Sequence, residues 1–472
     1  MVNMNSGIEF KEVLTRKSKV AYGSVNTAGN ILSGIGFTAI TFYYNVKLGL
    51  AAELIGIAWL IFAFWNAIND PLFGYIEDRT KSDLGRRIPY IRYGAPVYGV
   101  LFVLCWIPLV DITNEMALFL YFLIILFAFD TIFTIVVLIT YILPAEMAIT
   151  SKERASLMVY ATYIGVIGFV LTFVVPLILL TGETTGIDLN FIIAMIIIGA
   201  ACTVVMVVSS YYIKEYKFAQ LEEPLGVIPA LKESFKNKPF IIFELSLFCI
   251  ILGQTMLTTA VFYYVDFVLN LSGVMSIVPI IIVIGVMFAF AYPASKLIEK
   301  YGLKKVFIFG QITLGIGFVL TFFIGWSLNT VIISMVLIGI GLSILFMESP
   351  IILADTIDFD ELKTDKRRET TYTGIEALIT KPAISLGNWL FLVIISGYGF
   401  QEAAKTQPDS AILGIMIGFT IIPAIFIFLS ALIMKFYTLD GPEWTKQKLK
   451  LQGIHEKKEI EYLQHLKEQG NL

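Results

Sequence analysis

Three polar side chains lie within an apolar stretch that runs from about residue 51 to residue 76. Asn66, Asn69 and Asp70 are three or four positions apart, so a helix would place them on one face. A carboxylate inside a bilayer is costly, and it therefore usually faces a cavity and has a function there. Its oxygens could hold a proton or a hard cation such as Na⁺. The pattern predicts a cation-binding site at Asp70, to which a later apolar segment could add the hydroxyls of Thr131 and Thr134.

The composition predicts that membrane-spanning helices position these residues. Hydrophobic residues make up 57% of the 472 positions and charged residues only 15%, which is typical of membrane proteins. Twelve successive stretches are each long enough to cross about 30 Å of hydrocarbon. They lie at about 18–48, 51–76, 89–111, 115–145, 155–181, 188–213, 238–270, 273–297, 304–326, 329–355, 372–400 and 408–437.

The basic residues predict the orientation of this all-helical bundle. If both termini are cytoplasmic and Lys381 lies within a span, the external loops contain only Lys47 and Lys405 of the 34 Lys and Arg residues. This is the asymmetry that the positive-inside rule requires. Residues 1–19 are polar, and the first apolar run is too long for a signal peptide. We therefore expect a multi-pass protein of the cell membrane that is targeted by its first helix.

Several other classes of protein lack support in this sequence. The three cysteines lie in apolar segments without paired spacing, and the chain has only two histidines, so we predict structural thiols, no metal centre and no cofactor. A Ser-His-Asp set and a phosphate-binding glycine loop are both missing, which argues against an enzyme. The net charge of −3 gives no reason to expect a nucleic-acid partner.

A polar stretch divides the twelve segments into two sets of six. Residues 214–237 are the predicted cytoplasmic connector between an N-terminal bundle at 1–213 and a C-terminal bundle at 238–437, and residues 438–472 are a predicted cytoplasmic tail. GYIEDRTKSDLGRR at 74–87 follows the second segment, and ASKLIEKYGLKKV at 294–306 follows the eighth. Each combines acidic, basic and glycine residues in a tight turn. The repeat predicts two pseudo-symmetric halves with a solute bound between them.

Three longer motifs resemble those of one transporter family. The 74–87 turn is similar to the signature of the major facilitator superfamily, and the surrounding NDPLFGYIEDRTKSDLGRRIPYI resembles its glycoside-pentoside-hexuronide:cation symporter branch. LPAEMAITSKERASL at 143–157 and ADTIDFDELKTDKRRETTYTGIEALITKPAISLG at 354–387 agree with that branch. The resemblance implies the major facilitator fold and cation-coupled symport of a sugar or glycoside, and we expect a monomer surrounded by membrane lipid.

The family pattern bears on individual residues. Its cation-binding helix reads Asp-Ala-Ile-Asn-Asp-Pro, whereas residues 66–71 here read Asn-Ala-Ile-Asn-Asp-Pro, so the first carboxylate is replaced by Asn66. Because the second carboxylate is the one that takes up a proton in the family, the resemblance favours H⁺ over Na⁺ as the coupling ion, bound at Asp70. Lys381 matches a family lysine, but Gly29 and Asn30 replace a Lys-Asp pair of the family's sugar site.

Polar and aromatic side chains on the apolar segments are candidates for binding the solute, because amides, carboxylates and aromatic rings suit hydroxyl-rich rings. The candidates are Asn26, Asn30, Trp65, Asp130, Gln254, Thr258, Tyr263, Glu376, Lys381 and Trp389. For Asn26, Thr258 and Asn388 an interhelical hydrogen bond is the favoured interpretation. Lys381 could instead be the counter-charge of Glu376 or Asp130.

A second set of charged residues lies near the predicted cytoplasmic ends of the segments. We expect it to form a gating charge network that holds one conformer closed, and it comprises Asp78, Arg79, Arg86, Arg87, Glu348, Asp355, Asp358 and Asp360. Glu244 has the same expected role, through ion pairs with loop Lys and Arg residues.

These patterns predict alternating access, with the two halves rocking around a central site and with the ion at Asp70 changing the affinity for the solute. Three alternatives remain. One is an uncoupled facilitator of the same fold, suggested by the missing carboxylate at position 66. Another is a carrier of amphipathic lysolipids. The third is a membrane receptor, against which the absence of an attached signalling domain argues.

Overall fold

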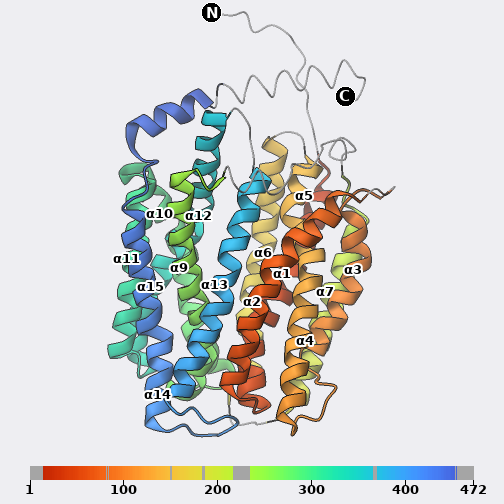
Figure 1. The fold of residues 1–472 in the computed structure, drawn as a ribbon, viewed down its shortest axis with the longest axis vertical. Coiled ribbons are helices and arrows are strands. Elements are labelled where there is room, and N and C mark those ends of the chain that lie inside the picture. The colour runs from red at the N-terminus through yellow and green to blue at the C-terminus, as the bar shows by residue number, and fades with distance from the viewer. Residues whose placement is uncertain are drawn as a thin grey trace, which may run out of the picture.

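The computed structural model describes residues 14–80, 82, 84–148, 151–182, 186–215, 234–364, 369–451 and 453. These residues form long helices that run side by side between the two ends of one bundle (Figure 1). We call the end at which α1 begins and α15 ends the terminal end, and the opposite end the distal end.

The first group of helices comes from the N-terminal part of the chain. It consists of α1 (Arg16–Phe42), η1 (Tyr43–Lys47), α2 (Ala52–Asp78), α3 (Ile88–Leu104), α4 (Glu115–Phe133), η2 (Thr134–Leu138), α5 (Ile139–Met147), α6 (Ser151–Leu180) and α7 (Leu189–Ser210). We refer to these as the N-terminal helices.

The second group follows from residue 238. It consists of α9 (Lys238–Tyr263), η4 (Tyr264–Val268), η5 (Gly273–Ile277), α10 (Val278–Tyr301), α11 (Leu303–Ile324), α12 (Leu328–Thr364), α13 (Glu369–Gly397), α14 (Asp409–Met416), η6 (Ile417–Ile421) and α15 (Ile422–Met434). These are the C-terminal helices, and residues 441–451 form a further short helix after them, here called the tail helix.

The lengths and hydropathies of these helices fit a membrane. Within the described residues, ten helical runs are long and apolar enough to span a bilayer. The apolar α3 is shorter, and α1, which has 27 residues, begins with Arg16 and Lys17 and carries Asn26 and Asn30 along its length. With α1 and α3 in the bundle, the helices follow one another as the twelve expected segments do.

The two groups meet along α2 and α13, which lie side by side at the centre of the bundle (Figure 1). Gly56 on α2 permits this approach, because a Cβ atom there would lie 3.2 Å from Cδ1 of Trp389 on α13. Small residues at such contacts let helices pack closely in lipid, where packing replaces the hydrophobic effect as the main source of association. Residues of α2 and α13 that face this α2–α13 seam are therefore placed to contact the other group.

Several helices contain π-helical turns. α1 continues into η1, and α9 continues into η4, so the first helix of each group ends at the distal end in the same way. Another π-helical turn, η2, interrupts the run from α4 to α5 and begins at Thr134. Such turns often occur at functional sites, because the extra residue per turn reorients the neighbouring side chains.

Candidate functional site

The α2–α13 seam contains an ion pair between the two groups of helices. The ammonium group of Lys381 on α13 donates a hydrogen bond to Oδ1 of Asp70 on α2, and both side chains are largely buried. The hydroxyl of Thr134, at the start of η2, donates to the same oxygen at 2.9 Å. The π-helical turn thus presents a side chain to the carboxylate predicted to bind the cation.

Asn69 extends this contact to a second carboxylate. Its amide group is fully buried and donates both to Oδ2 of Asp130 and to the hydroxyl of Thr134, each at 2.8 Å. A continuous chain of polar contacts therefore runs from Lys381 through Asp70, Thr134 and Asn69 to Asp130. This chain joins residues that the sequence assigned separately to cation binding and solute binding.

One face of α2 also presents acceptor atoms that lack a donor. Within the described part of the chain, Oδ2 of Asp70 and the side-chain oxygens of Asn66 and Asn69 are buried and have no hydrogen-bond partner. Buried acceptors are normally satisfied. Three unsatisfied oxygens within about one helical turn are therefore the atoms on which a proton or a small cation could bind. Thr131, the remaining predicted ligand, donates instead to the carbonyl of Phe127 in its own helix.

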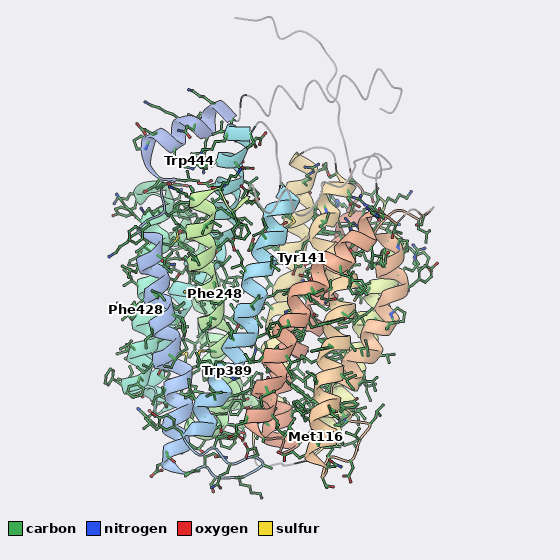
Figure 2. All side chains as sticks on the ribbon, viewed as in Figure 1. Met116, Tyr141, Phe248, Trp389, Phe428 and Trp444 are labelled. Atoms are coloured by element: carbon green, nitrogen blue, oxygen red, sulfur yellow. The ribbon has the colours of Figure 1, made fainter. Side chains whose placement is uncertain are left out.

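The polar residues of α1 contact α5. Asn26 donates to Thr140 at 3.0 Å, which is the interhelical hydrogen bond favoured for it from the sequence. Asn30 donates to Asn26 and accepts a hydrogen bond from Tyr141 at 3.1 Å. Figure 2 shows Tyr141 nearer to the terminal end of the bundle than Trp389. Asn26 and Asn30 therefore lie in one hydrogen-bonded group on the N-terminal helices.

Gln254 and Thr258 line a cavity of about 110 Å³ between α6, α9, α10, α12 and η6. The other residues of its wall are apolar, among them Phe169, Val283 and Phe419. The hydroxyl of Thr258 donates to a carbonyl of its own helix, whereas Asn388 accepts an interhelical hydrogen bond from Thr259 at 2.7 Å. The cavity is thus a separate feature from the Asp70–Lys381 pair and has a different chemical character.

The three predicted aromatic platforms lie in three different surroundings. Trp65 stacks on Phe127, and Trp389 contacts α2 at Gly56. Tyr263 is fully buried, packs against Phe42, Phe391 and Phe400, and donates to Asn45 at 3.0 Å.

The contact between Tyr263 and Asn45 belongs to a set of hydrogen bonds that join the two groups of helices at the distal end. The others connect Ala52 to Glu402, Glu53 to Ser396, Gly182 to Asp266 and Leu177 to Ser276. We call these five contacts the distal latch. In this conformation Tyr263 is a latch residue.

The terminal end contains two arginines of the predicted charge network, and both pair within the N-terminal helices. Arg86 and Arg87 both contact Glu146, and Arg87 also pairs with Glu77 at 3.1 Å. Glu215 accepts hydrogen bonds from the backbone N–H groups of residues 86, 87 and 88, where α3 begins. Burial raises the pKa of Glu215, and these three donors oppose part of that rise. The acidic partners of the two arginines were not identified from the sequence, although Glu77 and Glu146 lie within the two motifs quoted above.

Asp355 contacts the tail helix. It pairs with Lys448 and accepts a hydrogen bond from Trp444 at 2.8 Å; Figure 2 shows Trp444 at the terminal end. Asp360, further along α12, lies close enough to Tyr372 to interact with it. Asp358 is half-buried near Asp355, and Arg79 is exposed at the end of α2. The side chain of Asp78 lies outside the described part of the chain.

Glu348 differs from the other members of the predicted network. It is fully buried in α12, and within the described residues neither of its carboxylate oxygens has a hydrogen-bond partner. Glu244 on α9 is also buried, and within the described residues its two carboxylate oxygens likewise have no hydrogen-bond partner. The expected ion pairs with loop residues are therefore wrong for this conformation, because both side chains point into the bundle. Lys381, which could have neutralised Glu376 or Asp130, pairs with Asp70 instead.

Comparison with known proteins identifies the fold. The crystal structure of a D-xylose-proton symporter superposes with a TM-score of 0.61 at 15% sequence identity, and the match covers 89% of this chain and 96% of that one. The chain is therefore an all-helical membrane protein with the major facilitator fold.

Sequence comparison identifies the family. Residues 21–441 match the model of the MFS/sugar transport protein family, and the chain belongs to that family. The inner membrane symporter YicJ of Escherichia coli (strain K12) is 24% identical over 90% of this chain and 92% of its own length. The isoprimeverose transporter of Lactiplantibacillus pentosus is 21% identical over 92% of this chain and 91% of its own. The protein is therefore a multi-pass integral membrane transporter that acts on a small-molecule solute, and not an enzyme.

Proposed function

We propose that this protein is a symporter that couples uptake of a sugar or glycoside to a cation, most favourably a proton, bound at Asp70. The single observation that carries the proposal is the environment of Asp70, which pairs with Lys381 through one oxygen and leaves the other oxygen buried without a donor. A carboxylate in such a position can exchange its partner for a proton without any rearrangement of α2.

The ion pair suggests how coupling would work. Protonation of Asp70 removes the charge that holds Lys381, so the ammonium becomes available to the hydroxyl groups of a solute beside α13. A solute bound to Lys381 in turn draws the ammonium group away from Asp70, so that it competes less with a proton for the carboxylate and proton binding is favoured. By linkage, each ligand then raises the affinity for the other by the same factor.

Electrostatics favours a proton over Na⁺ at this position. The Lys381 ammonium lies against Asp70, and a fixed positive charge repels a second cation in a medium of low dielectric constant. A proton needs no space and neutralises the carboxylate. Na⁺ would need several oxygens at once, and the family carboxylate that would supply one of them is Asn66 here.

The positions of the contacts between the two groups of helices support alternating access by the proposed halves at 1–213 and 238–437. The distal latch joins η1, α2 and α6 to the C-terminal helices. At the terminal end, the ion pairs of Arg86, Arg87 and Lys448 connect residues of the same group. This pattern fits a conformer closed at the distal end. With both termini in the cytoplasm, that end would be external.

A thermal-shift screen of the purified full-length protein tests the proposal. Sugars and glycosides would be screened in Na⁺, in K⁺ and at two pH values. We expect at least one of them to raise the melting temperature by an amount that depends on pH in the native protein and not in Asp70→Asn. Stabilisation by a solute that is equal under all four conditions would contradict coupling and indicate a facilitator.

The apolar cavity supports a second candidate, a carrier of amphipathic lipids. It lies between α6 of the N-terminal helices and α9, α10 and α12 of the C-terminal helices, and its wall is almost entirely apolar. An acyl chain would suit such a wall, whereas a free sugar would not. Stabilisation by lysolipid in the same screen, with none by sugars, would favour this candidate over sugar transport.

A further inference from the structure

Two buried carboxyl groups in the C-terminal helices have no role in the scheme above. Glu244 on α9 is 1% exposed and Glu348 on α12 is 0% exposed. All four of their carboxylate oxygens are buried, and within the described residues none has a hydrogen-bond donor. Both groups are remote from the Asp70–Lys381 pair in the chain and belong to other helices.

The packing of α9 against α12 places the two groups at the same depth. Asn237, the N-cap of α9, donates to the carbonyl of Thr356 on α12 at 2.9 Å, and the two helices run in opposite directions. Glu244 follows Asn237 by seven residues, and Glu348 precedes Thr356 by eight. At 1.5 Å per residue, both lie about 10–12 Å from this contact toward the distal end.

A third carboxyl group lies in the same layer. Asn237 also donates to Tyr372 on α13 at 3.0 Å, and Glu376 follows Tyr372 by four residues, on the same face of the helix. Glu244 and Glu376 are close enough for their charges to repel each other. We call Glu244, Glu348 and Glu376 the C-terminal carboxyl layer.

Among the described residues, the charged groups near this layer either contact other partners or are exposed at the surface. On α13, Lys381 pairs with Asp70. On α12, Asp355 pairs with Lys448, and Asp360 lies by Tyr372. On the helices that pack against α12, Lys304 donates to backbone carbonyls, Lys296 pairs with Glu299 at the surface, and Lys300 and Lys305 are exposed. Lys238 on α9 is exposed, and α15 has no titratable side chain.

A buried carboxylate without a donor or a counter-ion is too costly to stay ionised, and it takes up a proton instead. A metal ion does not fit, because the described residues contain no group of three or more side chains that could hold one. We propose that Glu244 and Glu348 are two further proton-binding groups, each of which holds one proton in this conformation without Asp70 as a partner.

A small apolar cluster separates this layer from the terminal end. Phe240 and Tyr372 pack edge to face with ring centroids 4.6 Å apart, together with Ile357 and Ile375. These residues come from the same three helices as the carboxyl layer. Separation of α9, α12 and α13 at this end would therefore admit water to Glu244 and Glu348, and the two protons would leave. Proton release from Glu244 and Glu348 is thus tied to separation of these three C-terminal helices from one another, and not to separation of the two groups of helices.

Infrared spectroscopy of the purified full-length protein at neutral pH tests the assignment, because a protonated carboxyl group has a C=O stretching band that a carboxylate lacks. We expect Glu244→Gln and Glu348→Gln each to remove a distinct component of that band. Glu299→Gln, at an exposed ion pair, is the matched control and should leave the band unchanged. If neither Glu244→Gln nor Glu348→Gln changes the band, the two groups are ionised and the proposal is wrong.

A second variant covers the case in which a glutamine variant does not fold. Glu244→Asp keeps a carboxyl group and should shift its component of the band instead of removing it; an unshifted band would contradict the assignment. Asp70→Asn should retain both components. The infrared measurement therefore tests the protonation of Glu244 and Glu348 independently of coupling at Asp70, which is tested by transport.

Discussion

At the scale of single residues, the central feature is one carboxylate with two different oxygens. Asp70 shares Oδ1 between Lys381 and Thr134, while Oδ2 remains buried without a donor. The first oxygen ties the two groups of helices together, and the second is the atom on which a proton would be bound. Coupling in this account is a competition between a proton and Lys381 for the same side chain.

The competition predicts strong non-additivity between the two partners. Removal of one member of a largely buried ion pair leaves an uncompensated charge and typically costs about 3–5 kcal/mol. We therefore expect Asp70→Asn and Lys381→Gln each to lower the melting temperature, and the double variant to be more stable than the sum of the two single effects predicts. The measurement is a double-mutant cycle by thermal unfolding in detergent. Strictly additive effects would show that the pair contributes nothing.

The sequence predicted the helical face but not the partner. Asn66, Asn69 and Asp70 share a face because of their spacing, which local periodicity reveals. Lys381 is 311 residues away, and only the packing of α13 on α2 brings it to Asp70. The sequence also did not predict that the carboxyl groups of Glu244 and Glu348 lack hydrogen-bond donors, because this depends on which face of each helix packs against its neighbours. The direction of Tyr263 could not be foreseen either. It was predicted to contact the solute, and in this conformation it lies in the distal latch.

At the scale of elements, helix ends are stabilised by partners from distant loops. Glu215 follows α7 and accepts hydrogen bonds from three backbone N–H groups at the start of α3. The first N–H groups of a helix have no acceptor within the helix, and this end of a helix favours negative charge. Glu146 of α5 holds the neighbouring arginines. The turn between α2 and α3 is therefore fixed by two carboxylates outside it.

We expect Glu215→Ala to loosen this turn without changing solute affinity. Hydrogen bonds to a charged group contribute about 1.5–3 kcal/mol each, so amide hydrogen exchange at residues 86–88 should accelerate by at least about tenfold. Lys214→Ala, at the exposed neighbour, serves as the control. Unchanged protection in Glu215→Ala would mean that other groups satisfy these amides.

At the scale of the whole molecule, the contacts between the two groups are concentrated at the α2–α13 seam and in the distal latch. Hydropathy predicted an all-helical bundle and the order of its helices because each segment must satisfy its own backbone in lipid. The conformer could not be predicted in the same way. It depends on small differences between two packings of the same helices, which hydropathy does not contain.

The latch predicts how the conformer can be shifted. Glu402→Ala removes the acceptor for the N–H of Ala52, so a distal-open conformer should become more populated. Spin labels at Thr113→Cys and Ser327→Cys, both exposed distal positions on opposite groups, would report it in a background without the three buried native cysteines. We expect a longer distance component to grow in Glu402→Ala and not in Glu443→Ala, which alters the tail helix. An identical distance distribution would exclude Glu402 from the latch.

The most direct test of the account is solute uptake into proteoliposomes driven by an imposed proton gradient. The native protein should accumulate the solute identified by thermal shift above its external concentration. Asp70→Asn, which carries a neutral side chain of the same shape, should equilibrate or exchange that solute without accumulating it. Undiminished uphill uptake by Asp70→Asn would contradict the claim that this carboxylate couples the ion to the solute.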